Sequence, residues 1–215
     1  MTTSDHPIFL ESISFIKERL GFTGLNTLEQ SVLERLIHSS GDFAISSLLA
    51  FSPQACEIGL SALKAGAPIL VDTTMAAAAV RPMAQRTVNS LVINALDWVP
   101  DQIPQGFTRT AVGMDAAWKN LSEQYTDQKS PIVLVGSAPT ALQVLLDLIS
   151  RDYAKPSLII GMPVGFIGVS ESKKRLAKSG ISQIRIDGTK GGAGLAAATI
   201  NALLRECNLV DFYET

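Results

Sequence analysis

The feature that most constrains the fold is a series of short apolar runs, each followed by a stretch with helical periodicity. The runs are four or five residues long, are bounded by Gly, Pro, Asp or Asn, and lie at residues 68–71, 90–93, 131–135, 157–160 and 183–186. Continuous apolar runs of this kind are typical of strands buried on both faces, and strands that alternate with helices form parallel sheets through right-handed crossovers. We therefore expect an α/β fold with a mostly parallel sheet and helices on both faces.

The helices follow from apolar spacing, Gly stops and capping residues. An N-terminal helical segment is expected first, with helices over residues 8–20, 27–39 and 52–64. Later helices are expected over residues 75–83, 110–125, 139–150, 171–178 and 194–207. Asn26 or Thr27 is the expected N-cap of the second helix, with Gln30 near the capping-box position, and Pro53 is expected in the first turn of the third. No repeat or linker divides the chain, so we expect one domain over residues 1–215.

Composition and charge narrow the class of protein. The formal net charge is −2 and 47% of residues are hydrophobic, which excludes a basic footprint for nucleic acid and favours a homodimer interface besides a well-filled core. No charge-free apolar stretch is long enough to span a bilayer, and the N-terminus lacks the features of a signal peptide, so we expect a cytoplasmic protein without membrane contact. The two cysteines, Cys56 and Cys207, are far apart and predict unpaired thiols and no structural zinc.

One helix carries a histidine suited to acid–base chemistry. Arg35 and His38 are three residues apart, so they share a side of the second expected helix, with Ser31 one turn earlier. Histidine titrates near neutrality, and a neighbouring Arg lowers its pKa unless an anionic ligand lies between them. The other histidine, His6, is in the polar N-terminus, where we expect it to be solvent-exposed. The purely structural alternative for this helix is that the histidine lies near the last carbonyl groups and the Arg lies on the surface.

Three strand-to-helix connections contain residues that suit an anionic ligand, because ligands of parallel sheets lie beyond the carboxyl ends of the strands. The first connection holds Gly136 and Thr140 and offers amides at a helix N-terminus. The second holds Gly165 and Lys173 in a segment rich in Gly and Pro, and the third holds Lys190 among glycines.

Each of these connections also has a purely structural interpretation. The first can be an ordinary turn between a strand and a helix. The second can be a tight turn with Ser170 as N-cap and Lys173 as a solvated helix residue, and the third an exposed turn. Arg109, at the start of the fifth helix, can face a ligand or the solvent. Asp42 and Asp72 stand at element ends, where N-capping is the default role of an aspartate.

Taken together and in order, these motifs resemble the precorrin-8X methylmutase family, also described as cobalt-precorrin-8 methylmutases. The resemblance is collinear from about residue 8 to residue 203. Its most specific piece is Gly-Met-Pro-Val-Gly-Phe-Ile-Gly at residues 161–168, followed by Glu-Ser-Lys at 171–173. The other pieces include Arg35-x-x-His38 with Ser-Ser-Gly-Asp behind it, and Ala-Pro-Thr-Ala-Leu at residues 138–142.

The resemblance implies a metal-independent, cofactor-free isomerase of cobalamin (corrin) biosynthesis. Members of the family move a methyl group from C-11 to C-12 of a tetrapyrrole substrate, which gives hydrogenobyrinate or its cobalt form. His38 matches the catalytic histidine, which exchanges a proton with the macrocycle, and Ser14 and Arg35 match substrate-binding positions. Further positions near the ligand in the family's fold are matched by Arg109, Gly136, Thr140, Gly165, Lys173 and Lys190. A homodimer with the site close to the subunit interface is also implied.

Two other functions remain open from the sequence. The first is a doubly wound enzyme that binds a nucleotide or phosphorylated metabolite at the loops after Val135 and Asp187. Neither GxGxxG nor GxxxxGK[ST] is present to support it. The second is a tetrapyrrole carrier that has the pocket without the chemistry.

Overall fold

The computed structural model describes residues 6–125 and 129–210. Its sheet has the order β1-β6-β5-β4-β2-β3, and every neighbouring pair is parallel except β1 with β6. The strands are β1 (Leu49–Phe51), β2 (Ile69–Val71), β3 (Val92–Asn94), β4 (Ile132–Val135), β5 (Leu158–Gly161) and β6 (Gln183–Ile186). The mostly parallel α/β architecture is therefore confirmed, and the five expected strands are all present. The edge strand β1 was missed, because it has only three half-buried residues.

The expected helices are also confirmed. They are α1 (Pro7–Leu20), α2 (Thr27–Ser40), α3 (Ala55–Lys64), α4 (Thr74–Arg86), α5 (Arg109–Gln124), α6 (Pro139–Ile149), α7 (Val169–Ala177) and α8 (Ala193–Val210). Two short 3-10 helices, η1 (Phe43–Ser47) and η2 (Ala95–Trp98), were not expected. α4 continues past its expected end at Met83, with Pro82 inside it.

Several expected helix starts were wrong in detail. Asn26 is the N-cap of α2, as expected, but Glu29 completes the capping box, while Gln30 donates to Glu34 instead. Pro53 precedes α3, whose N-cap is Gln54 in the left-handed region. Glycine 168, and not Ser170, is the N-cap of α7. In each case the periodicity located the helix, and the choice of cap depended on backbone geometry that periodicity does not report.

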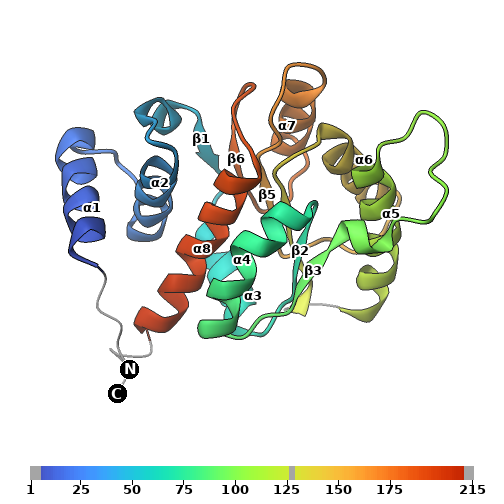
Figure 1. The fold of residues 1–215 in the computed structure, drawn as a ribbon, viewed down its shortest axis with the longest axis horizontal. Helices are drawn as coiled ribbons and strands as arrows, with labels where there is room; N and C mark the ends of the chain where they lie inside the picture. The colour runs from blue at the N-terminus through green and yellow to red at the C-terminus, as the bar shows by residue number, and fades with distance from the viewer. Residues whose placement is uncertain (1–5, 126–128, 211–215) are drawn as a thin grey trace.

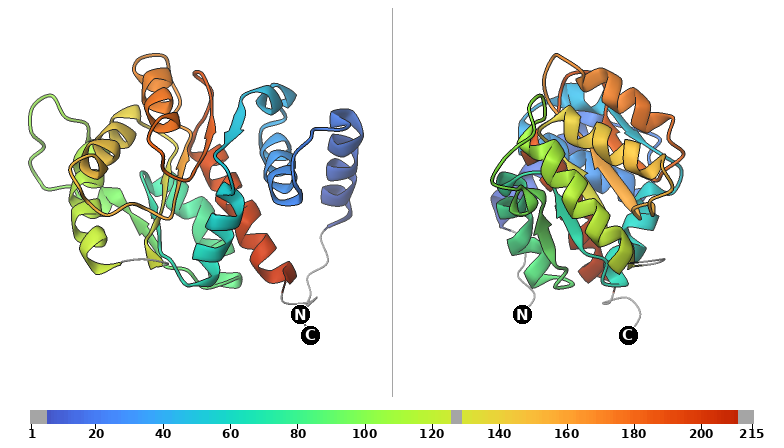
Figure 2. Two further views of the ribbon diagram at one scale, coloured as in Figure 1. Left: turned by 180° about the vertical axis from the view of Figure 1, so that it is seen from behind. Right: turned by 90° about the vertical axis from the view of Figure 1, so that its right-hand side faces the viewer.

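Alternate residues of each strand point to opposite faces of the sheet, so the molecule has two hydrophobic cores. Ile132 and Leu134 face the core formed with α2, α3, α4 and α8, whereas Val133 and Val135 face the core formed with α5, α6 and α7. Figure 2 shows α5 and α6 side by side on their face of the sheet. This two-sided burial explains why the strands read as continuous apolar runs.

The N-terminal helices form an extra layer on one side. In Figure 1, α1 lies at the far left of the molecule, next to α2, and α8 runs diagonally between α2 and the sheet. The order of the strands makes β2 and β4 neighbours while the chain proceeds outward from both, so their carboxyl ends form the topological switch point. We call the loops that follow β2, β4, β5 and β6 the carboxyl edge.

The described helices and the two cysteines bear on the expectations about membrane contact and thiols. None of the helices described in the structure combines the length and the apolar character needed to cross a membrane. Cys56 and Cys207 are buried and form no disulfide bond within the described part of the chain, as expected, and burial raises the pKa of the Cys56 thiol to about 12. A thiol in such an apolar site is chemically inert at neutral pH.

Candidate functional site

His38 lies near the end of a well-capped helix. At the start of α2, Asn26 accepts from the Glu29 amide and Glu29 accepts from the Asn26 amide. At its end, Gly41 adopts φ 66° and its amide donates to the Ile37 carbonyl. The positive φ favours glycine, because an L side chain is strained there. Both ends of α2 are thus fixed locally, which sets the direction in which Arg35 and His38 project.

The half-buried imidazole of His38 is held by two residues of α1. Its Nδ1 lies 2.9 Å from the hydroxyl oxygen of Ser12. The ring of Phe9 meets the imidazole edge to face, with centroids 5.0 Å apart. The same Phe9 ring lies 5.6 Å from the guanidinium carbon of Arg35 and 5.1 Å from that of Arg205. Phe9 therefore gathers one imidazole and two guanidinium groups around a single aromatic side chain.

The surroundings of His38 favour its neutral form. Burial lowers the pKa of His38, and the positive charge of Arg35 lowers it further. This is the electrostatic coupling expected from the spacing of the two residues. The purely structural alternative expected Arg35 to lie on the surface and His38 to lie near the last carbonyl groups of the helix. Its expectation for Arg35 is wrong, because Arg35 is half-buried against Phe9.

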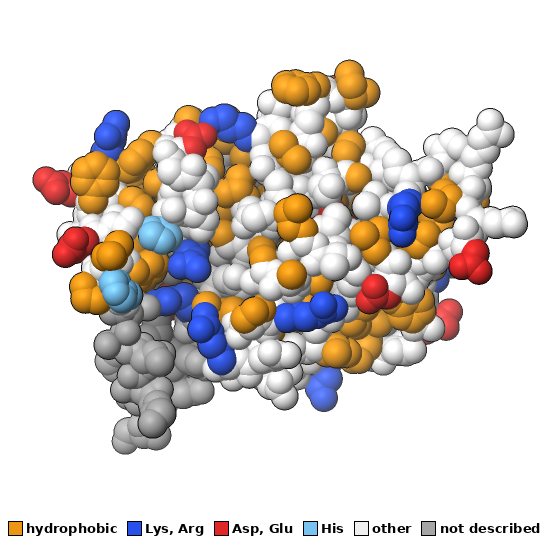
Figure 3. Space-filling view, viewed as in Figure 1, with side chains coloured by type: hydrophobic (Ala, Val, Ile, Leu, Met, Phe, Trp, Pro, Cys, Tyr) orange, Lys and Arg blue, Asp and Glu red, His pale blue; other side chains and the backbone are white. Residues whose placement is uncertain are grey.

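Beside His38 lies a groove of about 400 Å³ between three helices. Its lining comes from α1, α2 and α8, and we call it the helical groove: Phe9, Leu10, Ile13, Ser14, Lys17, Ser31, Glu34, Arg35, Ala202, Arg205 and Glu206. Two sequence-predicted residues, Ser14 and Arg35, are therefore brought to one hollow. Figure 3 shows the two histidines on this side of the molecule, next to several Lys and Arg side chains. The groove has a size typical of small-molecule sites and offers cations to an anionic ligand.

A larger groove, of about 640 Å³, lies between α6 and α7. Lysines and an arginine line it above an apolar floor: Lys155, Lys174, Lys178 and Arg175, with Leu146, Ile149 and Ile181. Arg175 is paired with Asp147 at 2.6 Å. None of the sequence-predicted residues lines this groove, whereas Ser14 and Arg35 line the helical groove and His38 lies next to it, in contact with Phe9 of its lining. The helical groove is the better candidate, because it combines Arg35 with the nearby imidazole.

The carboxyl edge holds the remaining predicted residues, and its first loop is closed by an aspartate. Asp72, fully buried at the end of β2, accepts from the amides of Gly136 at 3.1 Å and Ser137 at 2.7 Å. Burial raises the pKa of Asp72, while the two amides act in the opposite direction. The N-cap of α4 is therefore Thr73 and not Asp72. The expectation that an aspartate acts as an N-cap is confirmed for Asp42, at the start of η1, and is wrong for Asp72. The anion held by the Gly136 amide is a side chain of the protein itself.

The starts of α5 and α6 meet next to this loop. The hydroxyl groups of Thr108, the N-cap of α5, and Thr140, in the first turn of α6, are 2.7 Å apart. Arg109 follows Thr108 and is exposed. Gly136 is itself tightly packed, since a Cβ there would lie 2.6 Å from the Ala193 Cα. The structure thus brings Arg109, Gly136 and Thr140 together at one part of the carboxyl edge.

The loops after β5 and β6 are interlocked through their backbones. The amide of Gly165, where φ is 137°, donates to the Thr189 carbonyl, and the amide of Gly192 donates to the Met162 carbonyl. Gly191 is required for this approach, because a Cβ there would lie 2.2 Å from the Met162 oxygen. The glycines of the second and third motifs therefore let two loops pack on each other.

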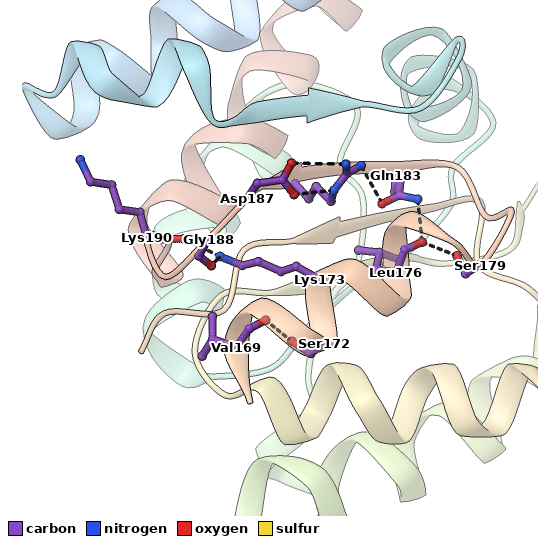
Figure 4. A network of polar contacts seen from close by, with 10 residues as sticks. Val169, Ser172, Lys173, Leu176, Ser179, Gln183, Asp187, Gly188 and Lys190 are labelled. Carbon is purple, nitrogen blue, oxygen red and sulfur yellow. Dashed lines mark hydrogen bonds and ion pairs between the residues drawn. The ribbon is translucent and has the colours of Figure 1, made fainter. Parts of the chain in front are cut away.

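Among the predicted site residues, Lys173 differs most from its expected surroundings. It is fully buried in α7, and its Nζ donates to the carbonyls of Gly188 at 3.0 Å and Lys190 at 2.5 Å (Figure 4). Burial lowers the pKa of Lys173 to about 8, although the charge of Asp187 raises it. The alternative of a solvated helix residue is wrong. The ammonium group faces the loop after β6 and holds it from inside.

Lys190 connects the carboxyl edge to α2. Its exposed side chain pairs with Asp42, whose carboxylate also caps η1 by accepting from the Ala44 amide at 2.9 Å. Asp42 comes directly after Gly41, the C-cap of α2. The two groups of predicted residues, one around the helical groove and one at the carboxyl edge, are linked by this pair.

The residues that sequence reasoning missed are Phe9, Ser12, Arg205 and Glu206. Phe9 and Ser12 are three apart on α1, so their common face was readable, but not that it meets His38. The Glu206 carboxylate accepts from the Ser31 hydroxyl at 2.9 Å, across 175 residues of sequence. No local pattern signals a contact of that separation.

Apart from Leu91, which precedes β3, the exposed large apolar side chains of the described residues lie in two places. On α1 and the loop after it, they are Ile8, Leu10, Phe15 and Phe22. Over the carboxyl edge and the loop before α5, they are Met75, Ile103, Phe107, Val164, Phe166 and Ile167. Phe166 and Ile167 are each 89% exposed. Patches of this kind mark surfaces that bind a ligand or another chain.

The chain is similar to known proteins along nearly its whole length. The family model described as precorrin-8X methylmutase matches residues 7–206. A cobalt-precorrin-8 methylmutase from Synechocystis sp. is 38% identical, over 95% of this chain and 97% of that protein. A precorrin-8X methylmutase from Pseudomonas aeruginosa is 36% identical, over 93% and 94%. A solved structure of precorrin-8x methyl mutase from Thermus thermophilus superposes with a TM-score of 0.83 at 35% identity, over 95% and 99%.

Proposed function

Since the chain belongs to the precorrin-8X methylmutase family, we propose that it isomerises precorrin-8X or cobalt-precorrin-8 in cobalamin biosynthesis. The methyl group moves from C-11 to C-12 of the macrocycle, so one carbon–carbon bond breaks, one forms, and no atom is gained or lost. The observation that carries the proposal is the placement of His38 beside a groove lined by Ser14 and Arg35, inside a chain that matches the family along nearly its whole length.

We assign to His38 the proton exchange that this shift requires. Protonation of the conjugated macrocycle redistributes its charge, and one positioned imidazole is enough to deliver and recover the proton. With Nδ1 engaged by Ser12, Nε2 is the nitrogen that we assign to the exchange. Ser12 and Phe9 set the orientation of the ring, because they contact it from two directions.

Arg35 and Ser14 bind the substrate in this proposal. A carboxylate of the macrocycle that pairs with the Arg35 guanidinium screens its charge from His38. The Coulombic part of the lowering of the His38 pKa is then lost, so the imidazole takes up a proton more readily in the complex than in the free protein. Binding thus prepares the acid for the chemical step.

The carboxyl edge completes the site in two ways. Arg109, beside this edge, is an exposed cation, and we assign it to a carboxylate at the periphery of the substrate. The side chains of Phe166 and Ile167 offer an apolar surface to the macrocycle. Gly136, Thr140, Gly165 and Lys173 shape the loops from which these groups project.

We further propose a homodimer in the cytoplasm, with the site close to the subunit interface. The exposed apolar residues of α1 and of the carboxyl edge supply a surface for the second copy. Light scattering after size exclusion tests this assembly, and a monomeric mass at micromolar concentration rules it out.

The decisive experiment follows the absorption change of precorrin-8X and, separately, of cobalt-precorrin-8 on incubation with the protein. We expect His38→Ala to lower kcat by about 10²–10⁴-fold with an unchanged circular dichroism spectrum. His6→Ala is the matched control and is expected to turn over like the wild type, because His6 is exposed and accepts a local hydrogen bond from the Ile8 amide.

The outcomes separate the proposals. Equal turnover by His38→Ala and the wild type would contradict the role of His38. Binding by the wild type without conversion of precorrin-8X or of cobalt-precorrin-8 in any of the assays would make the protein a tetrapyrrole carrier. A nucleotide enzyme is disfavoured, because the Gly136 and Ser137 amides that a phosphate would need are held by Asp72.

A further inference from the structure

The two lysines expected to bind substrate belong to one chain of contacts that ends at His38's helix. Lys173 reaches the loop after β6 from α7, and Lys190 leaves the same loop from its other side, as Figure 4 shows. The Lys173 ammonium binds the backbone of that loop, including the carbonyl of Lys190 itself. The base of the Lys190 side chain is therefore anchored from within the protein.

The other end of Lys190 meets the segment that follows α2. Its ammonium pairs with one oxygen of Asp42, while the other oxygen of Asp42 accepts from the Ala44 amide. Asp42 and the C-cap Gly41 are consecutive, and His38 lies in the last turn of α2. A displacement of Asp42 is thus passed to His38 through three intervening residues, two of which belong to α2.

On its other sides, His38 is in contact with α1 and Arg35. Ser12 and Phe9 hold the ring, but α1 is the outermost layer of the molecule and packs on α2. These contacts fix the ring relative to α1. The apolar face of α2 packs into the core with α8, and the chain after η1 pairs with β6. The Asp42–Lys190 pair adds a side-chain contact between the end of α2 and the loop after β6.

We propose that Asp42 and Lys190 are positioning residues, which hold the end of α2 and therefore His38 against the loop that Lys173 anchors. The inference rests on the proposed function, in which His38 exchanges the proton. It also assigns Lys190 a role that differs from contact with a substrate carboxylate. The pair is exposed, at 37% for Asp42 and 47% for Lys190, so its loss changes the stability of the fold little. Its effect is on placement, and catalysis is sensitive to displacements of about 1 Å.

The kinetic test uses Asp42→Asn, Lys190→Met and the double variant. Asparagine keeps an oxygen for the Ala44 amide, so Asp42→Asn removes the ion pair and spares the cap. We expect each single variant to lower kcat by about tenfold with KM nearly unchanged, and the double variant to be no worse than the single ones. Asp115→Asn and Lys119→Met break a matched exposed pair on α5 and are expected to behave like the wild type.

A different pattern overturns the inference. A higher KM for Lys190→Met together with normal kinetics for Asp42→Asn means that Lys190 contacts the substrate. Wild-type kinetics for all three variants means that the pair positions nothing. Additive losses in the double variant mean that the two residues act separately.

The second test observes His38 directly and needs no substrate. The chain contains two histidines, so the two imidazole Cε1–H signals can be assigned with His6→Asn. Asp42→Asn and Lys190→Met remove opposite charges, so a purely electrostatic effect moves the His38 signal in opposite directions. Loosening of α2 moves and broadens it in the same way in both variants, which is the result we expect, with the His6 signal unchanged.

The two tests keep the proposals apart. Opposite or absent changes of the His38 signal would overturn the positioning role. If the signal changes as expected but His38→Ala still converts substrate, the positioning holds and the proposed function fails.

Discussion

The helical groove and the carboxyl edge contain similar residues but use them differently. At the carboxyl edge, a buried carboxylate binds two amides and a buried ammonium group binds two carbonyls, so the polar groups of the loops are paired within the protein. In the helical groove, Arg35, Arg205 and Lys17 line a hollow between helices. The same residue types therefore support architecture in one region and line a hollow in the other.

This difference explains which residues change the fold and which change the chemistry. Buried groups such as Asp72 and Lys173 are costly to remove, because their partners remain in the interior without a hydrogen bond. Groups that line a groove can be replaced with little loss of stability, since water takes their place. Variants of the carboxyl edge should therefore act on unfolding, and variants of the groove on the properties of His38.

The largest expected effect on stability is that of Asp72→Ala. The change leaves the Gly136 and Ser137 amides without their acceptor, at a cost of about 1–3 kcal/mol for each buried group. The cost of burying the carboxylate offsets part of this, since burial raises the pKa of Asp72. We expect the free energy of unfolding to fall by about 2 kcal/mol in urea titrations. Asp115→Ala, on the exposed face of α5, is the control, and an equal change in both variants would contradict the internal role of Asp72.

A pH-dependent effect of similar size is expected from Lys173→Met. The pKa of Lys173 is about 8 in the folded protein and is 10.5 as its ordinary value, so the native state releases this proton first as the pH rises. The unfolded chain then binds more protons, and the stability of the wild type rises relative to Lys173→Met between pH 8 and 10.5. Between pH 8 and pH 10 the gain is on the order of 2 kcal/mol, and below pH 8 it is absent.

Urea titrations of the wild type and Lys173→Met at pH 7, 9 and 10 measure the difference between their free energies of unfolding. Contributions from the titration of other groups are the same in both proteins and cancel in this difference. Lys174→Met, the neighbouring lysine in α7 on the exposed side, is the matched control. A constant difference between wild type and Lys173→Met across this range would mean that Lys173 keeps its ordinary pKa.

The sequence predicted the architecture well because each signal was local. Apolar runs located β2 to β6, and spacing placed Arg35 and His38 on one side of α2. The spatial partners were not predictable in this way. Asp72 and Gly136 are 64 residues apart, and Ser12 and His38 are 26 apart on two helices whose packing no periodicity specifies.

Lys173 shows the limit most clearly. In sequence it stands in a polar helix among charged neighbours, which is the pattern of a solvated face. Its burial depends on two carbonyls of a loop 15 and 17 residues further on. A motif can thus mark a residue as special, while the partner that explains it becomes visible only in three dimensions.

The smallest expected effect concerns the helical groove. Arg35→Met removes the second cause of the lowered His38 pKa and leaves the first, burial, in place. We expect the NMR titration of His38 to move to higher pH and still to stop short of the ordinary value of 6.5. The imidazole is then protonated over a wider range of pH, because the repulsion by the guanidinium is gone.

Arg19→Met, which removes a guanidinium that stacks on Phe43 instead of Phe9, is the matched control and should leave the titration of His38 unchanged. The free energy of unfolding of Arg35→Met should stay within about 0.5 kcal/mol of the wild type, in contrast to Asp72→Ala. If Arg35→Met instead unfolds as readily as Asp72→Ala, the groove and the carboxyl edge do not differ in kind. In that case Arg35 belongs to the architecture, and the electrostatic preparation of His38 by a bound carboxylate loses its basis.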